Sequence, residues 1–147
     1  MLKILSDGDE RYRVEDSAGI PIGWISGRTI GFRGFVTEDD ARRATVAARH
    51  AFDKALAQQF TGWPCREPKL DELRTMRDGA YEVFHDANGA VARLLRPHRR
   101  AHDSSFGIEL ALPTYATEGV AITTAHSVGT AVEPYRDLPA AATRRMA

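Results

Sequence analysis

Short runs that alternate apolar and polar residues occupy the first quarter of the chain and predict antiparallel strands. Residues 12–16 alternate in this way, 16–19 form a polar turn with a glycine, and 20–24 alternate again. Two alternating runs around a short turn are typical of a β-hairpin. A third alternating run at 30–36 is expected to pair with the second.

The clearest local signal is a helix start at Thr37. Its hydroxyl can accept backbone N–H groups of the first turn, and the three carboxylates at 38–40 favour the positive end of the helix dipole. Apolar residues then recur at spacings of three and four, which predicts an amphipathic helix to about Phe60. Its apolar positions are Ala44, Ala48, Ala51, Phe52, Ala55 and Leu56.

The second half of the chain repeats strands and then a helix. The spacing of Leu70, Leu73 and Met76 predicts a short helix at 69–78, inside a linker. A second hairpin is predicted at 81–95, because an Asn-Gly pair between two alternating runs is a strong turn signal. A strand at 106–112 and a helix within 116–132 complete the predicted elements.

These elements predict an α+β fold in which one or more antiparallel sheets carry helices on one face. The length of 147 residues agrees with a single domain over 1–147. We expect a pseudo-repeat of two βββα lobes, at about 11–60 and 80–132, joined by the linker. The order of the strands, and whether the lobes share one sheet, are left open by the pattern.

Composition excludes several classes of protein. The 20 Lys and Arg balance the 20 Asp and Glu, which argues against a strongly basic nucleic-acid-binding chain. No apolar run approaches the roughly 18 residues of a membrane span, and no signal peptide is recognisable at the N-terminus. We therefore expect no membrane contact. Cys65 has no second cysteine to pair with, so we also expect a cytoplasmic protein. Arginine strongly outnumbers lysine, and we interpret this excess as a bacterial-like composition.

A polar stretch at 96–102 is the first candidate binding site. Guanidinium groups suit phosphate and other anions, so its arginines and first histidine are binding candidates, although a solvated strand connection is the favoured explanation. His98 and His102 have the spacing of a helical metal pair, but only Asp103 is near as a third ligand. We therefore predict no metal and no cofactor. The binding candidates in this stretch are Arg96, His98, Arg99 and Arg100.

The outer face of the first three predicted strands is the second candidate. If Tyr12, Val14, Ile20, Ile22, Trp24, Ile30 and Phe32 face the core, alternation turns Arg13, Ile25, Arg33 and Phe35 outward. Arginines beside an aromatic ring can hold single-stranded nucleic acid, and the same residues can form a protein interface. The balanced net charge favours the protein interface, or simple cover of this face by the second lobe, over nucleic acid. Arg13, Arg33 and Phe35 are the candidate residues.

No catalytic motif is present in the sequence. There is no Gly-x-Ser-x-Gly elbow, no glycine-rich phosphate loop followed by lysine, and no His-Glu-x-x-His. We therefore predict a non-enzymatic cytosolic module that works through a protein partner or as a homodimer. One alternative is a nucleic-acid-binding protein that uses the sheet face and the basic stretch. Another is a ligand-binding protein or enzyme with a pocket between sheet and helices, lined by Trp24, Phe32, Phe52 and Tyr81.

Overall fold

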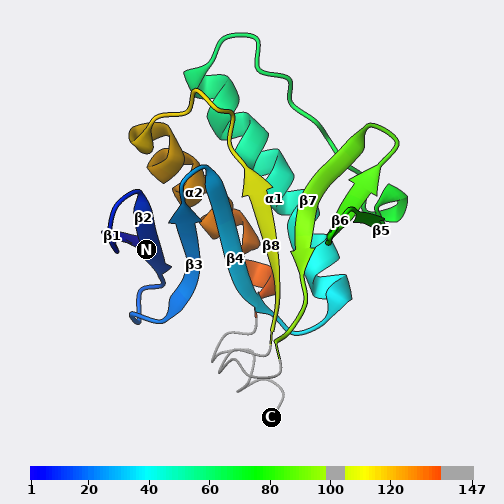
Figure 1. Ribbon diagram of the computed structural model, residues 1–147, viewed down its shortest axis with the longest axis horizontal. Coiled ribbons are helices and arrows are strands. Elements are labelled where there is room, and N and C mark those ends of the chain that lie inside the picture. The colour runs from blue at the N-terminus through cyan, green and yellow to red at the C-terminus, as the bar shows by residue number, and fades with distance from the viewer. Residues whose placement is uncertain (99–104, 137–147) are drawn as a thin grey trace.

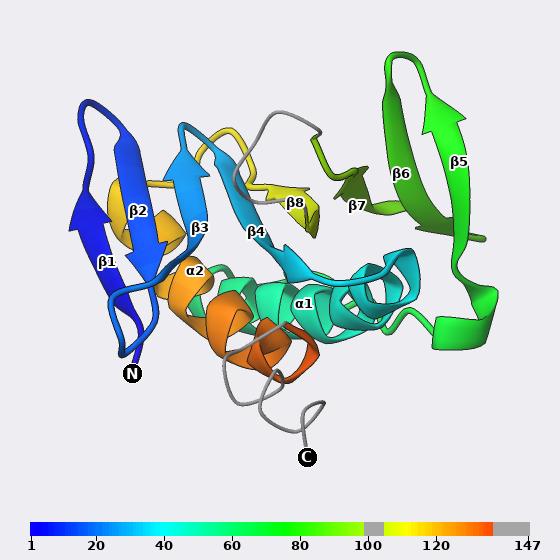
Figure 2. The same ribbon diagram turned by 90° about the horizontal axis from the view of Figure 1, so that it is seen from below.

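A computed structural model describes residues 1–98 and 105–136. Eight strands form one antiparallel sheet in the order β1-β2-β3-β4-β8-β7-β6-β5, and two α-helices cover one of its faces (Figure 1). The view turned by 90° shows both helices on the same side of the sheet (Figure 2). The elements are β1 (Lys3–Ser6), β2 (Arg11–Glu15), β3 (Pro21–Ser26), β4 (Thr29–Phe35), α1 (Glu38–Gln59), η1 (Leu70–Glu72), β5 (Arg74–Asp78), β6 (Tyr81–Asp86), β7 (Gly89–Leu95), β8 (Phe106–Ala111), α2 (Glu118–Val132) and η2 (Glu133–Tyr135).

The predicted α+β class, with an antiparallel sheet and helices on one face, is confirmed. Each half of the chain contributes four neighbouring strands and then a helix, and the two halves meet where β4 pairs with β8. The strands therefore belong to one continuous sheet rather than two separate sheets. The pseudo-repeat of two lobes stays a prediction. Among the described residues, no helix has the length and apolar character needed to cross a membrane.

The local signals at helix and hairpin starts correspond to observed elements. Thr37 caps α1, and its side-chain oxygen accepts a hydrogen bond from the Asp40 N–H at 3.0 Å. The first predicted hairpin is formed by β2 and β3, with β4 next in the sheet. The second is formed by β6 and β7. Turn and cap chemistry therefore predicts these element positions correctly.

The helix predicted at 69–78 is wrong. A single 3₁₀ turn, η1, is followed by β5, which pairs with β6 so that Met76 lies opposite Val83. Leu73 is buried whereas Met76 is 46% exposed, so the three apolar residues do not share one helix face. Pairing with β6 therefore outweighs a helical spacing that only three apolar residues support. The other edge strand, β1, has no counterpart among the predicted elements.

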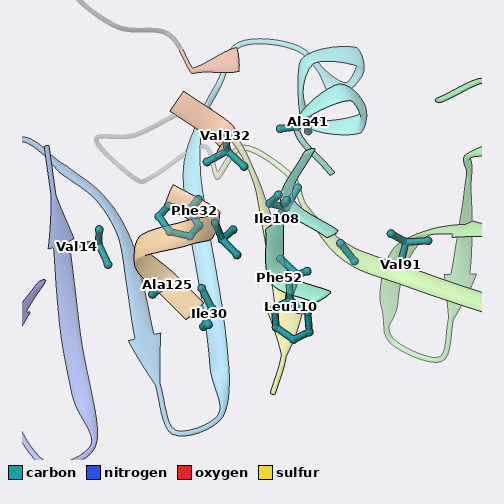
Figure 3. Packing of buried hydrophobic residues seen from close by; sticks show 14 of the residues in the cluster. Val14, Ile30, Phe32, Ala41, Phe52, Val91, Ile108, Leu110, Ala125 and Val132 are labelled. Atoms are coloured by element: carbon teal, nitrogen blue, oxygen red, sulfur yellow. The ribbon is translucent and has the colours of Figure 1, made fainter. Parts of the chain in front are cut away.

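The core lies between the sheet and the two helices. Phe32 of β4 and Phe52 of α1 are almost completely buried, and Figure 3 shows them among side chains from both helices and the central strands. Small residues let α2 approach the sheet closely. A Cβ atom added at Gly129 would lie 3.0 Å from the Phe32 ring. The rings of β4 therefore face the helices.

Two irregularities in the strands overturn the predicted facing of several residues. In β4, Arg33 pairs with Gly107 and Phe35 with Phe106, so Gly34 is an extra residue, at φ +108°. Such a bulge reverses the alternation, and Phe35 is buried in the core rather than on the outer face.

The register between β2 and β3 shifts as well, after Val14. Ile25 pairs with Tyr12 and Ile30 on the helix side and is buried, so its predicted outward position is wrong. Trp24 pairs with Arg13 on the opposite side. Ile20 precedes β3 and is 40% exposed, so it is not a core residue.

Candidate protein-binding face

The side of the sheet opposite the helices, here called the open face, is the first candidate surface. In Figure 1 the strands lie in front of both helices, so this side is turned toward the viewer. The register between neighbouring strands places one row of residues across it. From edge to edge the row is Leu5, Arg13, Trp24, Gly31, Glu109, Arg93, Val83 and Met76.

The indole of Trp24 lies directly on Gly31 in the middle of this row. A Cβ atom at Gly31 would stand 2.1 Å from the nearest indole carbon, so only glycine leaves room for the ring. Gly31 is buried and Trp24 partly buried. This stacking fixes a large aromatic side chain on β3, at the surface of the sheet rather than in its core.

A second aromatic side chain lies across the sheet from Trp24. The Arg93 guanidinium stacks 3.6 Å from the centre of the Tyr81 ring, and its Nη1 is 3.4 Å from Glu109 Oε1. Such cation–π stacking holds both side chains in place. Tyr81 is nevertheless 52% exposed, so one side of this pair is available to a partner.

Basic residues outnumber acidic ones on the open face. Six basic residues against three acidic ones leave a surplus of three positive charges. By the cross-strand register they are Lys3, Arg11, Arg13, Arg33, Arg74 and Arg93 against Glu15, Asp78 and Glu109. Because the whole chain has no net charge, this surplus is local to the face.

Two of the three binding candidates predicted on the outer sheet face lie on it. Arg13 donates from Nε to Glu15 Oε2 at 2.7 Å and lies 3.7 Å from Asp7. Arg33 donates from Nη1 to the Ser105 carbonyl at 2.9 Å. Both guanidinium groups are therefore already engaged within the chain. The third residue, Phe35, is in the core.

Arg96 lies near the start of α1, apart from the open face. It donates to Glu82 at 2.5 and 2.9 Å, and its Nη2 is 2.9 Å from Glu38 Oε1. The hydrogen bond from Arg96 holds the pKa of Glu82 below its ordinary value. Its charge is thus balanced by two carboxylates, which weakens the predicted anion site.

The rest of the basic stretch is only partly described. His98 is exposed, whereas Arg99, Arg100 and His102 lie outside the described residues. Within 1–98 and 105–136, no group of three or more metal-ligating side chains is found.

The predicted pocket does not form as a unit. Phe32 and Phe52 are core residues, while Trp24 and Tyr81 lie on the open face over different strands. The structure instead places a cavity of about 440 Å³ between the ends of β2 to β4 and the start of α2. Tyr12 and Arg28 are among its lining residues.

A gap opens in the sheet between β7 and β8. Their pairing covers only Arg93 with Glu109, Leu94 with Ile108, and Leu95 with Gly107. Beyond these pairs β7 turns away from β8, and α1 is visible behind the widening space in Figure 1. A cavity of about 270 Å³ lies there. Its lining includes Arg49, Tyr81, Val83, Val91, Arg93 and Leu110.

A buried carboxylate fixes the surroundings of this gap. Asp53 of α1 has no exposed surface, and it accepts hydrogen bonds from Arg49 Nε at 3.1 Å, Trp63 Nε1 at 3.1 Å and the Arg66 N–H at 3.0 Å. Arg66 in turn donates to Asp86 at 2.6 Å. The linker, α1 and the β6–β7 turn are thereby joined, which positions Arg49.

The sequence pattern does not predict this cluster. An acidic residue beside Phe52, on the apolar side of a helix, is the only signal for it, and two of its three partners, Trp63 and Arg66, are ten or more residues away.

Comparisons with known proteins identify no relative. A scan against protein-family models, a search of curated proteins and a search of solved structures each found no match. The functional assignment therefore rests on the residues and geometry described above.

Proposed function

We propose that the protein is a non-enzymatic interaction module that binds a partner protein on the open face of its sheet. The observation that carries this proposal is an eight-stranded sheet whose described helices, α1 and α2, lie on one side only. The bare side presents Trp24, Tyr81, Met76 and several arginines, residue types that are enriched at protein interfaces. The cytoplasm is the compartment we propose, from the lone cysteine.

The charge of the open face favours a partner other than a second copy of the chain. Face-to-face pairing would set its surplus of positive charge against itself, whereas an acidic partner surface would complement it. The sheet edges do not favour self-association either. They are short and carry charged side chains, Lys3 on β1 and Arg74, Arg77 and Asp78 on β5, which discourages pairing of edges. A homodimer is therefore the second candidate.

Nucleic acid is supported less well than protein. Stacking of bases needs exposed aromatic faces, and arginines must be free for phosphates. Phe35 is in the core, one face of the Tyr81 ring is covered by Arg93, and Arg13 is paired with Glu15. The positive surplus remains, so nucleic acid is an outcome that the test must recognise.

Site-specific photo-crosslinking tests the proposal. A photoreactive amino acid is introduced in source cells at Met76 or Leu5 on the open face, and at Val36 or Tyr115 as controls. Met76 and Val36 are matched in exposure, at 46% and 50%. We expect protein adducts of defined mass from the open-face positions only. Equal adducts from the controls, no adduct at all, or adducts with nucleic acid would refute the proposal, and an adduct of twice the chain mass would identify a homodimer.

A further inference from the structure

Three connections meet around the cavity of about 440 Å³ beside the start of α2. They are the turn between β1 and β2, the turn between β3 and β4, and the segment from β8 to α2, which lie at one end of the sheet in Figure 1. The Gly27 N–H donates to the Glu10 carbonyl at 3.0 Å. The Leu112 N–H donates to the Arg28 carbonyl at 2.7 Å. Backbone hydrogen bonds therefore fix the rim of the cavity.

Charged side chains of both signs line this rim. They are Glu10, Arg28 and Glu118, and all three are exposed. Within the described part of the chain, their side chains form no hydrogen bond and no ion pair. The arginine and the two carboxylates therefore remain available to a ligand that carries both a negative and a positive group.

The start of α1 shows how such charges are arranged when they pair. There too a glutamate, Glu38, is the first residue of the helix, and an arginine, Arg96, directly follows a strand from the other half of the chain. These two side chains are ion-paired at 2.9 Å, and Glu82 forms a second ion pair with the arginine. At the start of α2 the corresponding charges instead surround a cavity. This difference favours a ligand that supplies the missing ion pairs.

The floor of the cavity is apolar. Ile25, Leu112 and Ala121 are buried, and Tyr12 is partly buried. An apolar side chain of a ligand would be removed from water on this floor. The volume lies within the range of about 300–1,000 Å³ that is usual for small-molecule sites. The cavity therefore combines an apolar floor with a rim that carries charges of both signs.

We propose that this cavity binds a free α-amino acid with an apolar side chain. Its carboxylate would meet Arg28, its ammonium group would meet Glu10 and Glu118, and its side chain would lie on the apolar floor. A simple anion would face two carboxylates, an amine would face the arginine, and a peptide end carries only one of the two charges. The cavity lies on the helix side of the sheet, so this inference goes beyond the proposed function and does not depend on it.

Analogues that lack one charge test the proposal. Apolar L-amino acids are titrated into the protein up to about 10 mM while the backbone amide signals are followed by NMR. The best binder is then compared with its methyl ester, which lacks the carboxylate, and with the same carboxylic acid without the amino group. We expect saturable shifts of the Gly27, Arg28 and Ala121 amides, and binding at least about tenfold weaker for each analogue.

Arg28→Gln tests which group meets the carboxylate. Arg28 is exposed, so the variant is expected to fold, and its own amide spectrum checks this. It should bind the amino acid at least about tenfold more weakly but bind the methyl ester as the wild type does, because the ester already lacks that contact. Arg11→Gln is the control, since Arg11 is an exposed arginine on the opposite face of the same end of the sheet. It should bind both compounds as the wild type does.

Four results would overturn the inference. They are no shift with any amino acid, analogues that bind as tightly as the amino acid, shifts confined to other parts of the protein, and equal weakening of amino acid and ester by Arg28→Gln. The crosslinks at the open face are a separate experiment, and their outcome decides the proposed function rather than this inference.

Discussion

Replacing Asp53 by alanine should destabilise the protein strongly. The carboxylate has no exposed surface and accepts three hydrogen bonds at 3.0 to 3.1 Å, one of them from the guanidinium of Arg49. The alanine variant leaves the indole N–H of Trp63 and the backbone N–H of Arg66 without an acceptor. Removing one partner of a buried ion pair costs about 3–5 kcal/mol. That is a large part of the roughly 5–15 kcal/mol by which domains are usually stable.

Asp39 provides the matched control on the same helix. It also accepts hydrogen bonds from two arginines, Arg42 and Arg43, each at 2.8 Å, but its side chain is half exposed. Because exposed ion pairs contribute little to stability, Asp39→Ala should change the unfolding free energy only slightly. Urea unfolding followed by tryptophan fluorescence measures both variants. If Asp53→Ala lowers the unfolding free energy by less than about 1 kcal/mol, or if both variants lower it equally, the buried cluster does not stabilise the fold.

Two further predictions concern packing and pH. Gly31→Ala should cost about 1–3 kcal/mol in unfolding free energy, because the new Cβ would displace the Trp24 indole. Gly119→Ala in α2 should instead raise the unfolding free energy by up to about 1 kcal/mol, because its new Cβ would meet no atom closer than 4.0 Å. A lower unfolding free energy would contradict this reasoning. Arg96 holds the pKa of Glu82 below its ordinary value of 4.5. The ion pair therefore stabilises the fold above that pH, and this stabilisation is lost as the pH falls through the lowered pKa. Glu82→Gln should therefore reduce the decline of Tm between about pH 6 and pH 3, and an unchanged decline would refute this role.

Local chemistry made much of the fold predictable from the sequence. Two signals depend only on neighbouring residues, and both correspond to observed elements. They are Thr37 before three carboxylates and Asn88-Gly89 between alternating runs. Edge strand β5 was missed because its pairing with β6, rather than its own pattern, determines it. Alternation also carries no information about a bulge, so the extra residue at Gly34 reversed the side assigned to Phe35.

The candidate site depends more on long-range register. Arg13 and Arg33 could be assigned to a sheet face from alternation alone. The gap could not, because it requires knowing where β7 leaves β8 and that Arg49 of a distant helix lies behind it. Asp53 was missed for the same reason, since its partners Trp63 and Arg66 follow in a linker with no periodic pattern.

The junction between β4 and β8 has a consequence for how the chain folds. Every other strand pairing in the described residues joins strands that are consecutive along the sequence, so those ladders can form with short loop closures. Among these strand pairings, only β4 with β8 brings together residues from opposite halves, such as Ile30 and Leu110. Since non-local pairing slows folding, docking of the halves at this junction is expected to limit the folding rate. Truncating Ile30 should then slow folding, whereas loosening an outer hairpin should mainly speed unfolding.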